Sequence, residues 1–378
     1  MKFKFSFWAA LFLVFISCQN STSKPSSDEI VRRMESLVAE NQIPGLNFSI
    51  VYPDGKQEDY SVGFADTLRK QKLTTEHNLF SGSIGKTYLV ALFMQLVEEG
   101  RVELSDPFVK YFPETEWLQL LPNANDISIK MLLSHTSGLP RYVDEKGVWD
   151  TLQANPDKVW TYKERLSFIF NHKAVHAPGQ AWAYSDCNYL LLGMLIEKLT
   201  GSDFYDEVRS RILEPEELRA TYPAIKRNLP NLPVGYSRMP EFSRLNGIVV
   251  SDGKYAFNPQ MEWTGGGFVS TTADLARWAK LFYEHQLFSG EALKQITTPN
   301  RNGMDLGNGQ QYGMGSFIYD TEIGKAYGHT GFAPGFRSVF AYYPKQKIAV
   351  ALQLNSDYLG EKMSLIQYLD RILHGIKV

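Results

Sequence analysis

The sequence predicts an α/β protein of the α+β kind, in which an antiparallel sheet built from both chain ends is flanked by helices. Strand-like segments occur at residues 46–52 and 57–63, and they return only in the last seventy residues. The stretch between them has mainly the pattern of helices and long loops, which predicts a large helical insertion. We expect a sheet lobe of about residues 28–82 and 310–378 and a helical lobe of about residues 83–309.

Both chain ends supply elements of the predicted sheet lobe. Residues 28–42 carry apolar side chains at helical spacing and are followed by Pro44-Gly45, so a helix is expected there. Pro53-Asp54-Gly55 separates the first two strand segments and favours a hairpin. Towards the C-terminus we predict strands at 316–319, 336–343 and 348–354, and a closing helix at 358–373.

Composition is typical of one globular enzyme domain, residues 28–378. The chain has 378 residues, of which 44% are hydrophobic and 13% aromatic, enough to build a sizeable core. Its formal net charge of −2 does not suggest a nucleic-acid partner. We expect a small-molecule or peptide substrate and no metal or other cofactor, and we leave the oligomeric state open.

The N-terminus has the features of a signal peptide. Two lysines precede an apolar stretch from about Phe5 to Ile16, which is too short to span a bilayer as a helix. Phe15-Ile16-Ser17-Cys18 resembles a bacterial lipobox, in which Cys18 becomes the lipidated mature N-terminus. Residues 1–17 would then be removed and residues 18–27 would form a polar tether. We therefore expect a lipoprotein anchored in the cell envelope and facing the periplasm or exterior; the alternative is that Cys18 is an ordinary signal-peptide residue.

Ser83 and Lys86 stand at the start of an apolar helical segment that ends at Gly100. On a helix, residues three apart share a face with Cβ atoms about 5–6 Å apart, so the amine can reach the hydroxyl. Such a pair can make a serine nucleophilic, and the helix start directs backbone N–H groups at a developing oxyanion. The alternative is that Ser83 only caps the helix.

Two other motifs fit this stretch less well. A phosphate-binding loop requires a glycine five residues before Gly85-Lys86-Thr87, and that position is Phe80. A nucleophile elbow requires a glycine where Ser81 stands, so it remains a minor alternative. A nucleotide site is therefore not expected.

Two later loops carry further candidates. Residues 132–140 include His135, which is either a catalytic base or, as we favour, a histidine that ties down a turn. In the next loop, Asp186 or Asn188 can cap the helix that follows. Tyr184 has no capping role and can transfer a proton, so it is the stronger functional candidate.

Two glycine-rich segments complete the set. Gly265-Gly266-Gly267 permits close backbone approach, either to a ligand or to the neighbouring lobe. His329 lies in a glycine-rich segment at a strand edge, where a substrate backbone can lie alongside. The alternative for His329 is a partly buried strand histidine.

These stretches together resemble the serine β-lactamase and penicillin-binding protein superfamily, specifically the branch of class C β-lactamases, D-peptidases and related esterases. Ser83-x-x-Lys86 is similar to the first motif of that superfamily, Tyr184-x-Asp186 to the second and His329-Thr330-Gly331 to the third. Their order and spacing also fit, and residues 132–140 and 265–267 resemble two further signatures.

The resemblance implies roles for individual residues. Ser83 would be acylated, Lys86 and Tyr184 would share the general-base role, and the N–H groups of Ser83 and Phe332 would form the oxyanion hole. Either burial depresses the pKa of Lys86 or Tyr184 acts as its anionic partner. Asp186, His329, Thr330, Gly331 and Arg337 would contact the substrate.

Two positions depart from the commonest pattern. Asp186 stands in place of an asparagine, and a carboxylate accepts hydrogen bonds and repels an anionic substrate. His329 replaces a lysine, so carboxylate recognition is expected to be weak unless Arg337 substitutes for it. The implied protein is a serine hydrolase for an ester or a D-amino-acid-containing peptide or amide, with weak β-lactamase activity. The alternative is a catalytically silent envelope lipoprotein that binds cell-wall fragments.

Overall fold

The structure, a computed structural model, describes residues 26–300, 302, 306, 310–361 and 363–376. The predicted signal peptide, Cys18 and most of the tether lie outside the described residues.

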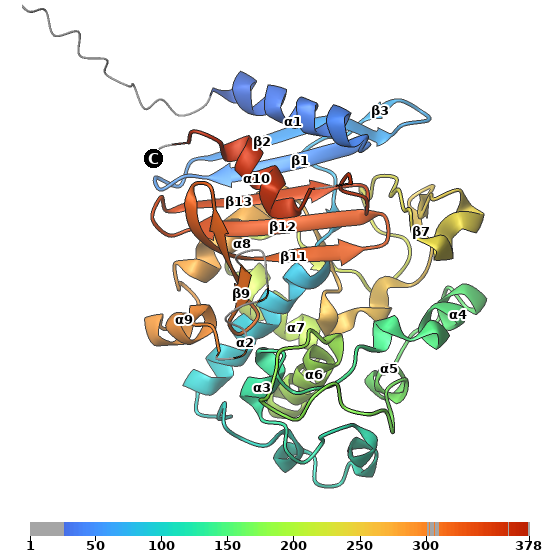
Figure 1. Cartoon of the computed structure of the whole chain (residues 1–378), viewed down its shortest axis with the longest axis vertical. Coiled ribbons are helices and arrows are strands. Elements are labelled where there is room, and N and C mark those ends of the chain that lie inside the picture. Colours follow the sequence, from blue (N-terminus) through green and yellow to red (C-terminus); the bar gives the residue numbers. More distant parts are fainter. Residues whose placement is uncertain (1–25, 301, 303–305, 307–309, 362, 377–378) are drawn as a thin grey trace, which may run out of the picture.

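An eight-stranded antiparallel sheet joins the two ends of the chain in the order β3-β2-β1-β13-β12-β11-β10-β9 (Figure 1). The first strand pairs directly with the last, so that Leu46 lies opposite Leu354. The predicted fold class is therefore confirmed. The strands are β1 Gly45–Val51, β2 Gln57–Asp66, β3 Gln71–Lys72, β9 Gln310–Tyr312, β10 Phe317–Thr321, β11 Gly324–Ala333, β12 Phe336–Tyr343 and β13 Ile348–Leu354.

Helices cover both faces of this sheet. Alternate residues of β13 explain how: Val350 and Leu352 pack in one core with α1 (Ser27–Asn41) and α10 (Leu365–Leu373). Ala349 and Ala351 face the other core, where their small side chains let α8 (Thr272–Tyr283) approach. The helix α8 lies within the stretch predicted as the helical lobe but packs on the sheet. The closing helix begins at Leu365, capped by Ser364, so the predicted start at residue 358 was too early.

The remaining helices form the lobe below the sheet in Figure 1. Its centre is the pair α2 (Lys86–Glu98) and α6 (Asp186–Thr200), whose side chains are buried almost all round. Neither these nor the other helices of the described ranges combine the length and apolarity needed to cross a membrane. The other helices are α3 Ile129–Leu133, α4 Lys146–Ala154, α5 Tyr162–Ser167, α7 Phe204–Val208 and α9 Gly290–Thr297.

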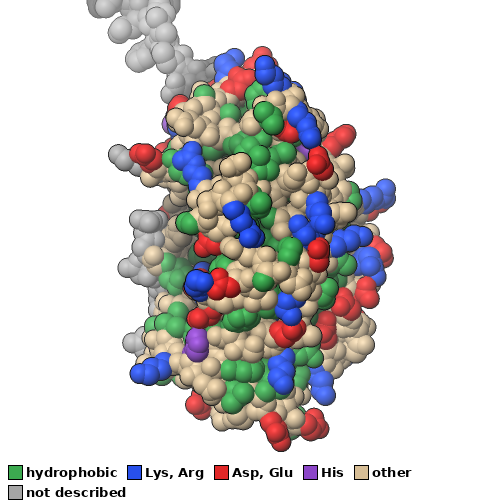
Figure 2. Space-filling model, turned by 90° about the vertical axis from the view of Figure 1, so that its right-hand side faces the viewer, with side chains coloured by type: hydrophobic (Ala, Val, Ile, Leu, Met, Phe, Trp, Pro, Cys, Tyr) green, Lys and Arg blue, Asp and Glu red, His purple; other side chains and the backbone are tan. Residues whose placement is uncertain are grey.

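Short strands connect the two lobes. The strands β4 (Leu79–Phe80), β8 (Phe268–Ser270) and β5 (Tyr222–Pro223) form a small sheet, and β6 (Val250–Ser251) pairs with β7 (Lys254–Tyr255). On the face seen in Figure 2, Lys, Arg, Asp and Glu side chains are interspersed, in keeping with the small net charge. The strand β4 leads directly into the turn that carries Ser83.

Candidate active site

Ser83 lies in a tight 3₁₀ turn, η1 (Gly82–Gly85), rather than in the first turn of an α-helix as predicted. Its neighbours in the turn are buried, whereas Ser83 itself is partly exposed. Gly82 has φ 51°, and a Cβ added to it would lie 2.5 Å from the backbone nitrogen of Phe332 on β11. Glycine is therefore required at position 82, and it brings Ser83 next to the strand edge that carries Phe332.

Lys86 is the first residue of α2 and is fully buried. Its Nζ donates to Ser83 Oγ at 3.0 Å, to Asp186 Oδ1 at 2.6 Å and to the Gly265 carbonyl oxygen. These three acceptors match the three N–H bonds of an ammonium group. Burial lowers the pKa of Lys86, but Asp186 and Tyr184 outweigh it and the net shift is upward. Of the two alternatives predicted for Lys86, a pKa depressed by burial is therefore not observed, because Asp186 supplies a counter-ion that the sequence analysis did not include.

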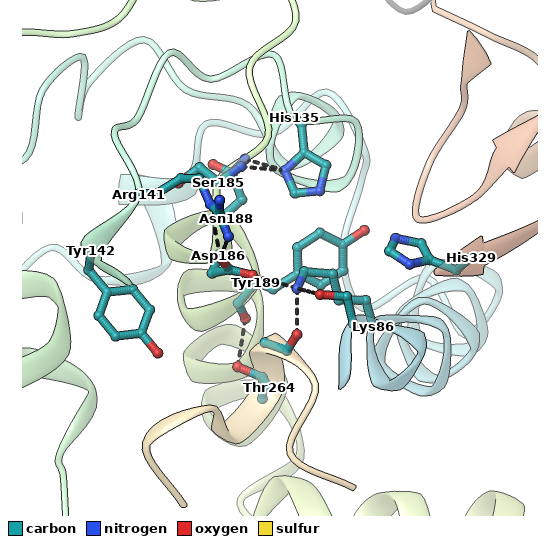
Figure 3. Close-up of polar contacts among 12 residues, drawn as sticks. Lys86, His135, Arg141, Tyr142, Ser185, Asp186, Asn188, Tyr189, Thr264 and His329 are labelled. Atoms are coloured by element: carbon teal, nitrogen blue, oxygen red, sulfur yellow. Dashed lines mark hydrogen bonds and ion pairs between the residues drawn. The ribbon is translucent and has the colours of Figure 1, made fainter. Parts of the chain in front are cut away.

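That counter-ion, Asp186, is itself buried and holds two cations. Its Oδ1 accepts from Lys86, and its Oδ2 accepts from Arg141 Nε at 3.2 Å and Nη2 at 2.9 Å. Figure 3 shows the Asp186 carboxylate between these two side chains. Burial opposes ionisation, yet Lys86 and Arg141 keep the pKa of Asp186 below its usual range. Asp186 is thus a positioning residue whose charge is neutralised, not the free substrate-repelling anion that we predicted.

Tyr184 precedes α6 and packs over Lys86, whose Nζ lies 5.1 Å from the centroid of the tyrosine ring. Its hydroxyl is buried and has no hydrogen-bond partner among the described residues. Burial raises the pKa of Tyr184 and the charge of Lys86 lowers it, with a net upward shift. The resting site therefore pairs a lysine ammonium with a protonated tyrosine.

His135 supports Tyr184 from behind. Its ring centroid lies 4.1 Å from that of Tyr184, and its Nδ1 accepts hydrogen bonds from Ser185 N at 3.1 Å and Asn188 Nδ2 at 3.0 Å. Figure 3 shows both bonds. Burial and the nearby charge of Lys86 hold the pKa of His135 well below its usual value. The favoured alternative, a histidine that ties down a turn, fits this geometry, and Asn188 binds His135 instead of capping α6.

The three glycines pack against the nucleophile turn. Gly265 ends the turn η8 (Trp263–Gly265), where its carbonyl oxygen accepts from Lys86. Gly266 has φ 149°, and a Cβ on it would lie 2.4 Å from the Gly82 carbonyl oxygen. Of the two predicted alternatives, close contact with neighbouring protein backbone is the one observed at Gly266.

His329 lies on β11, is 1% exposed and is neutral. Its Nδ1 donates to the Thr330 carbonyl oxygen at 2.6 Å, which leaves Nε2 to accept from Tyr312 Oη at 3.4 Å. Burial, assisted by the charge of Lys86, lowers the pKa of His329 to about 3. His329 therefore carries no positive charge at neutral pH with which to bind a substrate carboxylate.

Two recesses meet at Ser83. The first has a volume of about 650 Å³ and the second about 400 Å³, and Ser83, Arg141 and Phe332 line both. The second recess is also lined by Tyr184, His329, Thr330, Gly331 and Arg337. A substrate carbonyl at Ser83 thus has space on two sides, one for the acyl part and one for the leaving group.

Arg337 projects from β12, where it pairs in register with Phe332. Its Nε donates to the Asp357 carbonyl oxygen at 3.0 Å, and its guanidinium lies 4.4 Å from the centroid of the Phe332 ring. Ser83, Tyr184 and Arg337 thus line one recess, and Lys86 is buried beside it, where it binds Ser83.

Sequence reasoning missed two charged residues at the site. Arg141 directly follows the 132–140 signature, and Glu262 directly precedes the turn that ends at Gly265. Both line the first recess. A charge adjacent to a signature segment was the available signal in each case.

Comparisons with known proteins identify the family of the chain and its fold. The sequence profile of the Beta-lactamase family matches residues 30–373. A β-lactamase of Escherichia coli (strain K12) is 27% identical over 71% of this chain, which spans 64% of that protein. Penicillin-binding protein 4* of Bacillus subtilis (strain 168) is 23% identical over 84% of this chain and 69% of its own length.

A solved structure has a closely similar fold. The D-amino acid amidase from Ochrobactrum anthropi SV3, complexed with L-phenylalanine amide, superposes with a TM-score of 0.77 and 25% identity. The match covers 92% of this chain and 97% of the amidase. From the profile match over almost the whole chain, together with this fold, we conclude that the chain belongs to the Beta-lactamase family.

Proposed function

We propose that the protein hydrolyses esters, amides or peptides of D-amino acids through an acyl-enzyme on Ser83. The observation that carries this proposal is the 3.0 Å hydrogen bond between Lys86 Nζ and Ser83 Oγ, at a partly exposed serine where two recesses meet. The similarity to a D-amino acid amidase over nearly the full length of both chains supports this substrate class. A catalytically silent protein that binds cell-wall fragments is the second candidate, but nothing in the cleft favours it over turnover.

Acylation begins in the molecules in which Tyr184 has lost its proton: Ser83 Oγ attacks the substrate carbonyl carbon and its proton passes to the Tyr184 phenolate oxygen. The new C–O bond leaves a negative charge on the carbonyl oxygen, next to the N–H groups of Ser83 and Phe332, which would stabilise it. The leaving nitrogen or oxygen then departs with the proton carried by Tyr184, and water repeats the sequence to release the acid.

Tyr184 is the better proton acceptor because Lys86 is held as an ammonium. All three N–H bonds of Lys86 are donated, and one of them already points at the serine oxygen. In this role Lys86 supplies positive charge, which lowers the pKa of Tyr184 against the opposing effect of burial. The two residues therefore act together: Tyr184 accepts the proton, and the ammonium group of Lys86 assists it by stabilising the phenolate.

Weak activity towards β-lactams follows from the second recess. With His329 neutral, Arg337 and Arg141 are the cations that line it, and Arg141 is already bound to Asp186. A substrate carboxylate placed beside Thr330 would thus depend on Arg337.

Covalent labelling tests whether Ser83 is the nucleophile, and a panel of substrates tests the proposed substrate class. A fluorophosphonate should add mass to the peptide containing Ser83, and the Ser83→Ala protein should stay unlabelled. Ser81→Ala is the matched control, because Ser81 is buried two residues away and its hydroxyl has no hydrogen-bond partner within the described part of the chain. In one buffer, kcat/KM should be higher for a D-aminoacyl amide and a short-chain nitrophenyl ester than for nitrocefin.

Three outcomes of these assays would contradict the proposed function. Label on another residue would exclude Ser83 as nucleophile. Faster turnover of nitrocefin than of the other two substrates would overturn the substrate class. Binding of cell-wall fragments without label or turnover would favour the silent alternative.

We also propose that the protein is a lipoprotein anchored through Cys18 and facing the periplasm or exterior. The support is the lipobox-like segment directly after an apolar stretch. Palmitate should label the wild type and the Cys187→Ala control, since Cys187 is fully buried, but not Cys18→Ala. A wild type that is unlabelled and partitions into the aqueous phase of a detergent extraction would contradict the anchor.

A further inference from the structure

The first recess is lined by more carboxyl side chains than cationic ones. Its two cations are already engaged: Arg141 with Asp186 at 2.9 Å, and Lys146 with Asp150 at 2.6 Å. Five carboxylate side chains line the recess: Asp144, Asp150, Asp186, Glu241 and Glu262. Two of them, Glu241 and Glu262, have no salt-bridge partner among the described residues.

Glu262 lies close to the catalytic group. It precedes η8, and its Oε2 comes within 3.5 Å of the position a Cβ would take on Gly265, the residue whose carbonyl binds Lys86. Burial, and after it the charge of Asp186, raises the pKa of Glu262 to about 7 against the effect of Lys86 and Arg141. A carboxylate in this position gains from any cation that enters the recess.

Glu241 lies on another wall, in the turn η6 (Pro240–Leu245). Its Oε2 is shielded from solvent and has no hydrogen-bond partner among the described residues. Gln153 Nε2 holds the Glu241 backbone carbonyl at 3.3 Å, which fixes the turn. One oxygen of this partly exposed carboxylate is therefore shielded from solvent and available to accept a hydrogen bond from a ligand.

An aromatic side chain completes the recess. Trp149 lines it, and its ring packs edge-to-face against Phe242 at 6.2 Å and against Phe257 at 6.1 Å. Its Nε1 donates to the Val143 carbonyl oxygen at 2.9 Å, so the ring is held in one orientation. An oriented indole near unpaired carboxylates suits an ammonium ion better than a neutral or anionic group.

We propose that the first recess binds a primary ammonium group on the acyl part of the substrate, with Glu262 and Glu241 as its counter-ions. This inference rests on the proposed function of Ser83 and narrows its substrates to acyl donors that carry a free amine. Glu262, beside the residue that binds Lys86, takes the α-ammonium of an amino acid. Glu241, on the other wall, takes an ammonium carried on the substrate side chain.

Paired substrates test this subsite. We would compare kcat and KM for the p-nitroanilides of D-phenylalanine, N-acetyl-D-phenylalanine and N-acetyl-D-lysine in wild type, Glu262→Gln and Glu241→Gln. Asp150→Asn is the matched control, because this carboxylate lines the same recess but is exposed and already paired with Lys146.

Loss of the charge-assisted hydrogen bond between the substrate ammonium and a glutamate should lower kcat/KM about tenfold, mainly by raising KM. Wild type should prefer the free amine of D-phenylalanine over its N-acetyl form by at least that factor. Glu262→Gln should remove this preference and leave the N-acetyl substrate unaffected. Glu241→Gln should lower only the activity towards N-acetyl-D-lysine, and Asp150→Asn should resemble the wild type.

Fluorophosphonate labelling of Ser83 in each variant separates this inference from the proposed function. Normal labelling with no preference for the amine in wild type, or with the preference intact in Glu262→Gln, would overturn the ammonium subsite alone. Loss of labelling in wild type would instead overturn the proposed function. Should Glu262→Gln fail to fold, protection of wild-type Ser83 from labelling decides the matter: D-phenylalaninamide should protect and its N-acetyl form should not, and equal protection would overturn the subsite.

Discussion

The Tyr184→Phe protein should fold normally, and its kcat/KM for a neutral nitrophenyl ester should fall by a factor of about 10² to 10⁴. The Tyr184 hydroxyl has no hydrogen-bond partner among the described residues, so its removal leaves no buried group unsatisfied. The same hydroxyl is the proposed acceptor of the Ser83 proton. Stability and activity are therefore expected to separate in this variant.

The matched control is Tyr319→Phe. Tyr319 lines the same recess as Tyr184, and its buried hydroxyl likewise has no hydrogen-bond partner in the residues that the structure describes. Loss of a buried hydroxyl as such would affect both variants, whereas loss of the base would affect only Tyr184→Phe. Retention of more than about a tenth of the wild-type kcat/KM, an effect below ~1.4 kcal/mol, would exclude Tyr184 as the base.

The pH dependence of the wild-type activity also tests the role of Tyr184 as the base. Burial raises the pKa of Tyr184, and Lys86 offsets this only in part. The fraction of phenolate thus increases with pH through the neutral and mildly alkaline range. The wild-type kcat/KM for a neutral ester should accordingly still be rising at about pH 9, and this rise should be absent in Tyr184→Phe.

Much of the fold followed from local pattern. The strands β12 and β13 have the bounds predicted for them, because β-branched and aromatic residues bounded by turn residues give a clear signal. The pairing of the first strand with the last needed a different argument, namely the return of strand composition after a long helical stretch. The long strand β11 was less evident, since Gly324, Gly328 and Gly331 weaken the strand pattern.

The sequence identified the main residues of the site but did not predict their charge states. Spacing placed Ser83 and Lys86 together because they are three residues apart in one turn. The partner that fixes the charge of Lys86 is 100 residues away in sequence, and Arg141 joins it from a third segment. The neutrality of His329 likewise depends on burial by Tyr312 and other distant aromatic residues. Such effects require the tertiary structure.

Asp186→Asn should shift the catalytic pH profile and destabilise the fold. The carboxylate raises the pKa of both Lys86 and Tyr184, so a neutral amide of the same shape should lower both. The rising limb of kcat/KM should therefore move to lower pH by about one unit or more, where each unit corresponds to 1.36 kcal/mol.

The stability effect arises because two buried cations lose their shared counter-ion. Removal of one partner from a buried ion pair costs about 3–5 kcal/mol of stability. Because the amide oxygen of asparagine can still accept a hydrogen bond, we expect the loss in Asp186→Asn to be no larger than this. Since the pKa of Asp186 is depressed in the folded state, its contribution is present above the unfolded value of about 4 and is lost as the pH falls through the lower folded value. Urea unfolding of both proteins at pH 7 measures the full difference.

Asp144→Asn provides the control for this variant. Asp144 also pairs with Arg141, at 3.4 Å, but its side chain is 64% exposed, so its charge is screened by water. It should leave both the pH profile and the free energy of unfolding close to those of the wild type. An unshifted profile in Asp186→Asn would mean that Asp186 does not set the charge of Lys86 and Tyr184. A loss of stability without that shift would restrict Asp186 to holding the lobe together, and Lys86 would have to be reconsidered as a neutral base.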